Sequence, residues 1–146
     1  MEKVTSSLED YLEAIYQICQ ESQVARVKEI AERMKVTDAS VVGALKVLRK
    51  KRLIEQERYG YIRLTGAGEA MARDVFGRHE ALARFFNEVL GLGEKAADEE
   101  ACRAEHCLED KTVGRLALLQ KFLGHKMKKT DRLLGEFGEF VKRKGM

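Results

Sequence analysis

The sequence predicts a mostly α-helical protein with one short β-hairpin before its midpoint. Apolar residues recur at helical spacing over most of the 146 residues, and the chain contains no proline that would interrupt those helices. Apolar and polar residues alternate, as strands require, on both sides of Tyr59-Gly60. The hydrophobic content of 45% is enough for one compact core or for two small domains that share an interface.

Three helices are expected before the hairpin. Residues 6–21 open with a serine and then Glu9, which is a helix-start signature, and their apolar residues follow at a spacing of 3.6. A short helix fits residues 25–36, with an inward face made of Val27, Ile30, Ala31 and Met34. A third helix begins after Thr37 or Asp38 as its cap, and its apolar stripe comprises Val41, Val42, Leu45 and Leu48.

The order helix, helix, basic helix, hairpin is that of a winged helix-turn-helix, with Gly60 taking a positive φ at the turn of the wing. Residues 26–63 hold eleven Lys and Arg against five acids, a net charge of +6 that suits a polyanion such as DNA. The candidate DNA contacts among these basic residues are Arg26, Lys28, Lys46, Arg49, Lys50 and Arg58. The alternative is that the basic face only keeps an ordinary helix solvated.

The rest of the chain also has helical periodicity. A long helix is expected to begin after Thr65 as its cap and to end at Gly91 or Gly93. An acidic helix over about residues 95–109, a helix over residues 112–123 and an amphipathic C-terminal helix follow. No linker-like segment separates the two halves, so the boundary falls on the long helix. We expect a DNA-binding domain at residues 1–70 and a second, helical domain at residues 71–146.

The acidic helix contains a group of potential metal ligands in the stretch DEEACRAEHCLED, residues 98–110. Cys102, Glu105 and His106 stand at i, i+3 and i+4, so on a continuous helix they converge on one face. A thiolate, a carboxylate and an imidazole all bind metals. Residues 94–110 also carry a net charge of −5, which favours a cation.

Three donors do not complete a metal site, and the chain offers further candidates elsewhere. Asp10 and Glu13 lie one helical turn apart on the first helix, and His79 lies halfway along the long helix. Each has an alternative explanation without a metal. Asp10 suits the first turn of a helix because of the helix dipole, Glu13 suits a solvated face, and His79 suits a packing or surface position.

Several runs resemble, in order, the diphtheria toxin repressor family of iron- and manganese-dependent transcriptional regulators, which includes the manganese transport regulators. These runs are SLEDYLEAIY, residues 25–54, RLTGAGEAMA, RHEALARFF and EACRAEHCL. The resemblance extends from about residue 6 to residue 123. It implies an N-terminal winged helix joined to a helical dimerisation domain, with metal between the two, in the compact form that lacks an SH3-like domain.

The resemblance also implies roles for individual residues. The metal ligands that it implies are Asp10, Glu13, His79, Cys102, Glu105 and His106. Asp10 and Glu13 match the manganese branch, whereas Cys102 matches the iron branch, so the chain is a hybrid of the two. Ala83 and Asp98 depart from the second metal site of the iron branch. Thr37 and Ser40 match positions that approach DNA, but Gly43 replaces a base-contacting glutamine of the toxin repressor.

The sequence thus predicts a homodimeric, metal-activated regulator that binds double-stranded DNA operators and represses metal-uptake genes. The expected activator is Fe²⁺ or Mn²⁺, and Zn²⁺, Co²⁺ or Ni²⁺ are expected to substitute in vitro. No apolar run reaches the ~18 residues of a membrane helix, and no signal peptide is evident, so we expect a cytoplasmic protein without a membrane partner. Its cysteines should then be reduced, with Cys19 and Cys107 as small core residues.

Two other classes of function remain alternatives at this point. One is a winged-helix regulator that senses a small organic ligand, in which the acidic helix is only a solvated face. The other is a metalloenzyme, but no general base beside an open coordination position and no second set of convergent polar groups is recognisable. We therefore do not expect an enzyme.

Overall fold

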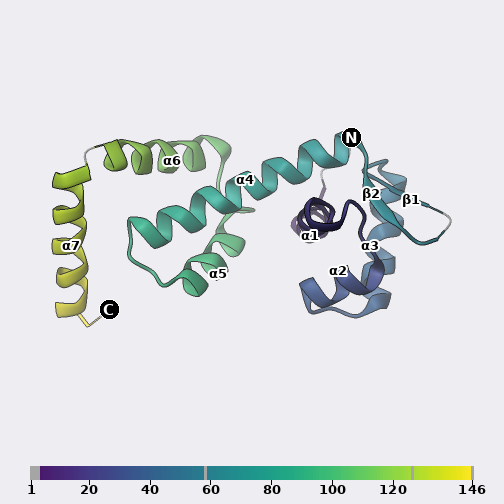
Figure 1. Cartoon of the computed structure of the whole chain (residues 1–146), viewed down its shortest axis with the longest axis horizontal. Helices are drawn as coiled ribbons and strands as arrows, with labels where there is room; N and C mark the ends of the chain where they lie inside the picture. The colour runs from purple at the N-terminus through teal and green to yellow at the C-terminus, as the bar shows by residue number, and fades with distance from the viewer. Residues whose placement is uncertain (1–3, 58, 126, 146) are drawn as a thin grey trace. The chain divides into compact units, whose positions relative to one another are not determined.

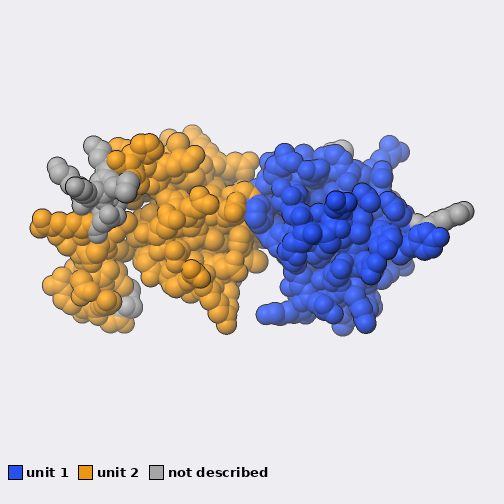
Figure 2. Space-filling model, in the orientation of Figure 1, with its two compact units in different colours: residues 1–76 blue, residues 77–146 orange. Residues whose placement is uncertain are grey.

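The computed structural model describes residues 4–57, 59–125 and 127–145. The chain forms two compact units, unit 1 (residues 1–76) and unit 2 (residues 77–146), which Figure 2 shows in two colours. None of the helices in the described ranges is both long enough and apolar enough to cross a membrane.

Unit 1 contains three helices followed by a two-stranded antiparallel hairpin (Figure 1). The helices are α1 (Ser6–Ser22), α2 (Val27–Met34) and α3 (Asp38–Lys50), and the strands are β1 (Ile54–Gln56) and β2 (Ile62–Leu64). Ile54 pairs with Leu64, and Gln56 pairs with Ile62. Ala25 forms an additional bridge to Ile62, which ties the connection between α1 and α2 to the hairpin. The predicted winged helix-turn-helix is confirmed.

Local signals in the sequence explain where these elements begin and end. The hydroxyl of Thr37 accepts a hydrogen bond from the backbone N–H of Ser40, so Thr37 caps α3 as predicted. Gly60 has a φ of +76°, which closes the hairpin in a region that favours glycine. Thr65 caps the following helix, α4 (Gly66–Glu88), by accepting a hydrogen bond from the N–H of Gly68.

The core of unit 1 comes from all three helices and the hairpin, and Leu12, Ile15, Ile30, Leu48 and Ile62 are among its fully buried side chains. One part of the predicted α3 stripe is wrong. The buried residues of α3 are Val41, Ala44, Leu45 and Leu48. Val42 is 41% exposed, because a residue one position after Val41 lies about 100° further around the helix.

Unit 2 contains the rest of α4 and three further helices: α5 (Glu94–Ala104), α6 (Asp110–His125) and α7 (Met127–Arg143). A small core forms around Leu82, Ala101 and Val113. The acidic helix is shorter than predicted, since α5 ends at Ala104 and a turn follows. Cys107 lies in this turn and is exposed, so its predicted core position is wrong.

Candidate metal centre and DNA interface

His79 is the centre of a polar cluster within unit 2. It projects from α4, and its side chain is only 15% exposed. Its Nδ1 atom lies 2.8 Å from Oε2 of Glu105, and its Nε2 atom lies 2.9 Å from Oδ1 of Asp98. Because Asp98 lies on α5 and Glu105 is the residue that ends this helix, the imidazole ties α4 to α5 at two points.

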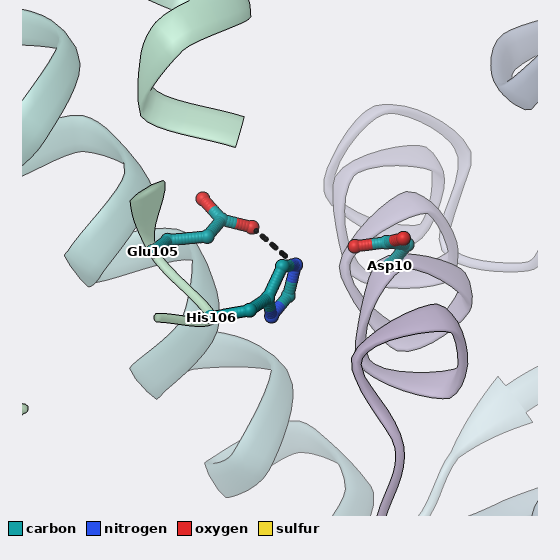
Figure 3. Close-up of side chains that lie close together, drawn as sticks. All are labelled: Asp10, Glu105 and His106. Atoms are coloured by element: carbon teal, nitrogen blue, oxygen red, sulfur yellow. Dashed lines mark ion pairs between the residues drawn. The ribbon is translucent and has the colours of Figure 1, made fainter. Parts of the chain in front are cut away.

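Glu105 is the only buried charged residue in the described part of the chain, with an exposure of 0%. Its Oε1 atom accepts no hydrogen bond from any described residue. Nε2 of His106 lies 3.1 Å from this oxygen, which is an ion-pair distance, and Figure 3 shows the two side chains facing one another. A carboxylate held out of water is costly unless positive charge or hydrogen bonds compensate it.

The donor set of this cluster fits a divalent cation. Glu105 offers a buried carboxylate oxygen with unused capacity as an acceptor, and His79 and His106 are partly buried imidazoles beside it. Two nitrogen donors and a carboxylate are ligands for Mn²⁺, Fe²⁺ and Zn²⁺ alike. The cluster can therefore contribute part of a metal site, which needs further ligands from outside it.

Cys102, Glu105 and His106, the three residues predicted to converge, differ in burial. The side chain of Glu105 is fully buried, whereas Cys102 is exposed. The buried residues of α5 are Ala97 and Ala101, which stand eight and four positions before Glu105. Glu105 caps the C-terminal end of α5 in a helical conformation, and its backbone N–H donates a hydrogen bond to the carbonyl oxygen of Ala101, so it continues this buried side of the helix.

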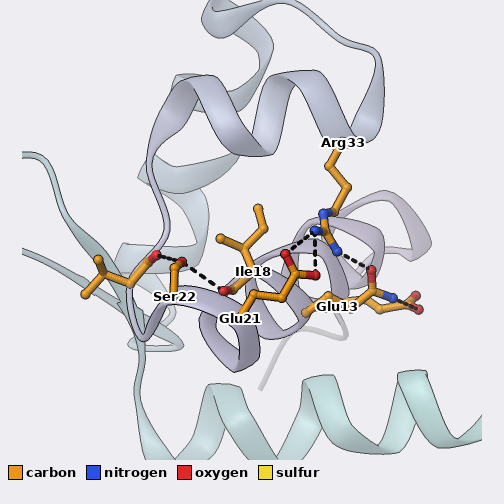
Figure 4. A network of polar contacts seen from close by, with 7 residues as sticks. Glu13, Ile18, Glu21, Ser22 and Arg33 are labelled. Carbon is orange, nitrogen blue, oxygen red and sulfur yellow. Dashed lines mark hydrogen bonds and ion pairs between the residues drawn. The ribbon is translucent and has the colours of Figure 1, made fainter.

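Asp10 and Glu13 lie on α1 of unit 1, and both are half-buried. Oε1 of Glu13 accepts a hydrogen bond of 3.1 Å from the side-chain amide of Gln17. The amide oxygen of Gln17 in turn accepts a hydrogen bond of 3.0 Å from Arg33 on α2. Arg33 also donates hydrogen bonds to both carboxylate oxygens of Glu21 (Figure 4). Glu13 is thus connected to the first helix of the helix-turn-helix.

Two residues outside the predicted ligand set contact the candidate ligands. The carboxylate of Asp98, which the resemblance to the iron branch marks only as a departure, contacts His79. The signal was its place seven residues, or two helical turns, before Glu105. The second residue is Gln17, which stands four residues after Glu13, at the spacing that brings side chains together on a helix.

Ala83, the other departure from the iron branch, has a packing role in unit 2. It contacts the cluster formed by Leu82, Ala101 and Val113. An alanine methyl group has no metal-binding atom. The small core of unit 2 thus occupies the position that the resemblance gives to a carboxylate of the second metal site.

The predicted DNA contacts of unit 1 are exposed wherever the structure describes them. They comprise Arg26, Lys28, Thr37, Ser40, Lys46, Arg49 and Lys50. Arg58 lies outside the described residues. Thr37 and Ser40 stand at the N-terminal end of α3 with their hydroxyl oxygens 2.9 Å apart. Arg26 donates a hydrogen bond of 2.9 Å to the hydroxyl of Tyr61 in the hairpin and stacks over its ring.

Comparison with known proteins agrees with this arrangement. Residues 3–62 match the family model of the iron dependent repressor N-terminal DNA binding domain. Residues 65–133 match that of the iron dependent repressor metal binding and dimerisation domain. The predicted boundary at residue 70 lies between the end of the first match and the division of the two units after residue 76.

Individual relatives cover most of the chain. It is 35% identical to an HTH-type transcriptional regulator of Methanocaldococcus jannaschii. The 121 aligned residues cover 82% of this chain and 97% of the relative. It is also 32% identical to the HTH-type transcriptional regulator MntR of Bacillus subtilis strain 168. The 128 aligned residues cover 87% of this chain and 89% of the relative.

Solved structures resemble the fold. The metal-dependent transcriptional regulator MtsR superposes on 82% of this chain with a TM-score of 0.73 and a sequence identity of 26%. IdeR of T. acidophilum superposes on 84% of this chain with a TM-score of 0.70 and a sequence identity of 24%. The chain spans 55% of the length of each of these two solved chains. Since both halves match family models and full-length relatives exceed 30% identity, the chain belongs to the iron dependent repressor family of metal-dependent, DNA-binding transcriptional regulators and is not an enzyme.

Proposed function

We propose that this regulator is activated by Fe²⁺ or Mn²⁺ and represses metal-uptake genes as a homodimer on a double-stranded DNA operator in the cytoplasm. The proposed metal ligands come from both units. They are Asp10 and Glu13 on α1, His79 on α4, Cys102 in the last turn of α5, and Glu105 and His106 directly after this helix. We propose residues 1–70 as the DNA-binding domain and residues 71–146 as the metal-binding and dimerisation domain.

The observation that carries this proposal is the environment of Glu105. Its carboxylate is fully buried, one of its oxygens accepts no hydrogen bond from the described residues, and two imidazoles flank it. A divalent cation at this position would neutralise the buried charge and use the remaining acceptor capacity. The segment also lies in the match to the metal binding and dimerisation domain.

Activation follows from linkage between metal binding and DNA binding. Without a cation, Asp10, Glu13 and Glu105 would repel one another if they shared a site, so holding the DNA-binding domains in one arrangement would cost free energy. Neutralising these carboxylates removes that cost before DNA binds. By reciprocity, DNA then raises the affinity for metal by the same factor as metal raises the affinity for DNA. The coupling free energy is typically about 1–3 kcal/mol.

We propose that α3 enters the major groove and that the basic residues around it contact phosphates. Lys46, Arg49 and Lys50 lie exposed on the last turns of α3, and Arg26 and Lys28 add charge at the beginning of α2. The sequence adds a further candidate, Arg58. Thr37 and Ser40, at the N-terminal end of α3, suit a phosphate oxygen because backbone N–H groups point outward there. Val42 is exposed on the same helix and suits an apolar contact with a thymine methyl group.

The test is a DNA mobility-shift titration with Fe²⁺ (anaerobic), Mn²⁺, Co²⁺, Zn²⁺ and chelator, using the wild type and His106→Ala. We expect His106→Ala to abolish the metal-stimulated shift while the dimer stays folded. His125→Ala is the matched control, because His125 is exposed on α6 and its Nδ1 atom lies 2.8 Å from the carbonyl oxygen of Lys121 on the same helix. A full metal response of His106→Ala would reject the proposed ligand set.

The choice between the two metals depends on ligand type. The thiol of Cys102 is soft and disfavours Mn²⁺, whereas the carboxylates of Asp10 and Glu13 are hard and favour Mn²⁺ and Fe²⁺. We therefore propose Fe²⁺ as the physiological activator, with Mn²⁺ next. Cys102→Glu should improve the Mn²⁺ response relative to Fe²⁺. If the wild type responds to Mn²⁺ at much lower free concentration than to Fe²⁺, this assignment of the metal is wrong, whereas the proposed regulator mechanism is unaffected.

A further inference from the structure

The imidazole of His79 lies between two carboxylates that differ in their surroundings. On one side, Nδ1 is 2.8 Å from Oε2 of Glu105, which is fully buried. On the other side, Nε2 is 2.9 Å from Oδ1 of Asp98, whose side chain is 69% exposed. The two nitrogens of an imidazole point in diverging directions, so the two carboxylates occupy different sides of the ring.

A histidine binds a metal through one ring nitrogen while the other nitrogen carries the proton and donates it to a neighbouring acceptor. Nδ1 of His79 faces Oε2 of the buried carboxylate of Glu105, whose other oxygen accepts no hydrogen bond from the described residues. Nε2 faces the solvent-exposed carboxylate of Asp98, which is a suitable acceptor for an N–H group. From this geometry we infer that Asp98 is a positioning residue that holds His79 with Nδ1 directed toward the ion. This inference rests on the proposed metal site.

The placement of Asp98 argues against a role as a direct ligand to the same ion. Among the described residues, no group of three potential ligand atoms lying within 4.8 Å of one another includes Asp98. The contact of Asp98 with His79 is therefore the one through which we expect it to act on the metal. It does so from α5, two helical turns before Glu105, so one helix supplies both carboxylates that bracket the ring.

Such an arrangement affects metal affinity in two ways. The carboxylate fixes the orientation and tautomer of the imidazole, and its negative charge makes the ligating nitrogen a better donor. Partners of this kind are typically worth about 10–100-fold in metal affinity. We expect the lower end of this range here, because water screens an exposed carboxylate such as Asp98.

The inference is tested by titrating the full chain with Mn²⁺ and measuring the free ion by electron paramagnetic resonance. Asp98→Ala should weaken binding by about tenfold with the number of ions per chain unchanged. Asp98→Asn should lose less, since the amide oxygen still accepts the N–H. Glu99→Gln is the matched control, because Glu99 is the next residue on α5 and pairs with Lys95 instead of His79. It should bind Mn²⁺ like the wild type.

A second measurement separates positioning from a general structural effect. In the Co²⁺-loaded wild type, the Nε2–H proton of His79 should give a paramagnetically shifted, exchangeable proton resonance that persists in water. Asp98→Ala should broaden this resonance by faster exchange with solvent, whereas Glu99→Gln should leave it unchanged.

Three results would overturn the inference. The first is an unchanged Mn²⁺ affinity in Asp98→Ala. The second is the loss of one whole ion per chain in this variant, which would make Asp98 a ligand. The third is a proton resonance of His79 that Asp98→Ala leaves unaffected. Wild-type Mn²⁺ binding and metal-dependent DNA binding are measured on the same preparations. If these succeed while the Asp98 variants behave like the wild type, only the role of Asp98 is wrong; if they fail, the proposed function is wrong as well.

Discussion

Burial divides the three cysteines into two classes with different expected reactivity. Cys19 is partly buried against the core of unit 1, whereas Cys102 and Cys107 are exposed. Desolvation by burial raises the pKa of the Cys19 thiol, and its Sγ atom lies 3.9 Å from the carbonyl oxygen of Ile62. Since the thiolate is the reactive form, Cys19 should react slowly with thiol reagents in the folded protein.

We predict that a thiol reagent at neutral pH and without metal labels two cysteines rapidly, and a third only when the protein unfolds. Mass spectrometry of the early product should locate the label on Cys102 and Cys107. The Cys19→Ser variant is the control and should keep both fast sites while losing the slow one. Fast labelling of Cys19 in the native protein would contradict the burial described here.

Gly68 is a position at which α4 approaches the chain before the hairpin too closely for any side chain. A Cβ atom at Gly68 would lie 1.9 Å from the carbonyl oxygen of Leu53, a backbone atom that cannot turn away. Gly77, on the same helix, has no neighbour within 4 Å of its Cβ position among the residues described. The two glycines therefore respond differently to the same substitution.

We predict that Gly68→Ala lowers the free energy of unfolding by about 1–3 kcal/mol, as overpacked sites do. Gly77→Ala should raise it by about 0.5–1 kcal/mol, because alanine favours a helix over glycine. Denaturant unfolding of both variants provides the measurement. Equal effects of the two substitutions would show that the contact between Gly68 and Leu53 does not constrain the fold.

The helices and the wing could be predicted because their signals are local. Thr37 and Thr65 precede their helices as caps, and Gly60 stands where the hairpin turns. The end of α5 could not be predicted in this way, since no glycine or proline stands between Ala104 and Asp110. The core around Ala101 and the pairing of Glu105 with His79 involve residues distant in sequence, which periodicity does not reveal.

The basic end of α3 gives a prediction for DNA binding that does not depend on the operator sequence. Lys46 and Arg49 are exposed, and each would release a counterion on contact with phosphate. Lys46→Ala or Arg49→Ala should weaken specific and non-specific binding similarly and reduce the slope of log affinity against log salt by about one unit each.

Arg73→Ala is the control for this measurement. Arg73 is an exposed arginine of α4 whose guanidinium is 2.7 Å from Glu69, so its charge is already partly compensated. Its replacement should leave the slope close to that of the wild type. If the slopes of the Lys46 and Arg49 variants are also unchanged, the phosphate contacts lie elsewhere in unit 1.

The two units supply different parts of the proposed mechanism, DNA binding and metal binding. Unit 1 has the basic surface and the α1 carboxylates, and Gln17 connects Glu13 to Arg33 on α2. Unit 2 has the buried carboxylate and its two imidazoles. A ligand shared by the two units would thus affect helices that belong to the DNA-binding domain. We further expect full DNA affinity to require two half-sites about one DNA turn apart, and hence two copies of the chain.

The apolar surface of unit 2 is where we expect these copies to associate. Leu118 and Phe122 on α6 are 65% and 60% exposed, and Leu133, Phe137 and Phe140 form an exposed stripe on α7. Exposed apolar stripes of this kind are typical of an interface between subunits. The match to a dimerisation domain includes α6 and the beginning of α7.

We predict that Leu118→Glu shifts the protein from dimer to monomer in light scattering, because a carboxylate would lose its hydration on entering an apolar interface. The fold of the monomer should persist by circular dichroism, since Leu118 contributes little to the core of unit 2. Lys121→Glu is the control on the same helix: it introduces the same acid at an exposed position that is already polar, and should leave the dimer intact. Leu118→Glu should also bind operator DNA more weakly at saturating metal, whereas its own metal affinity should change little. A wild type that is monomeric with and without metal, or a Leu118→Glu variant that remains dimeric, would exclude α6 as the interface.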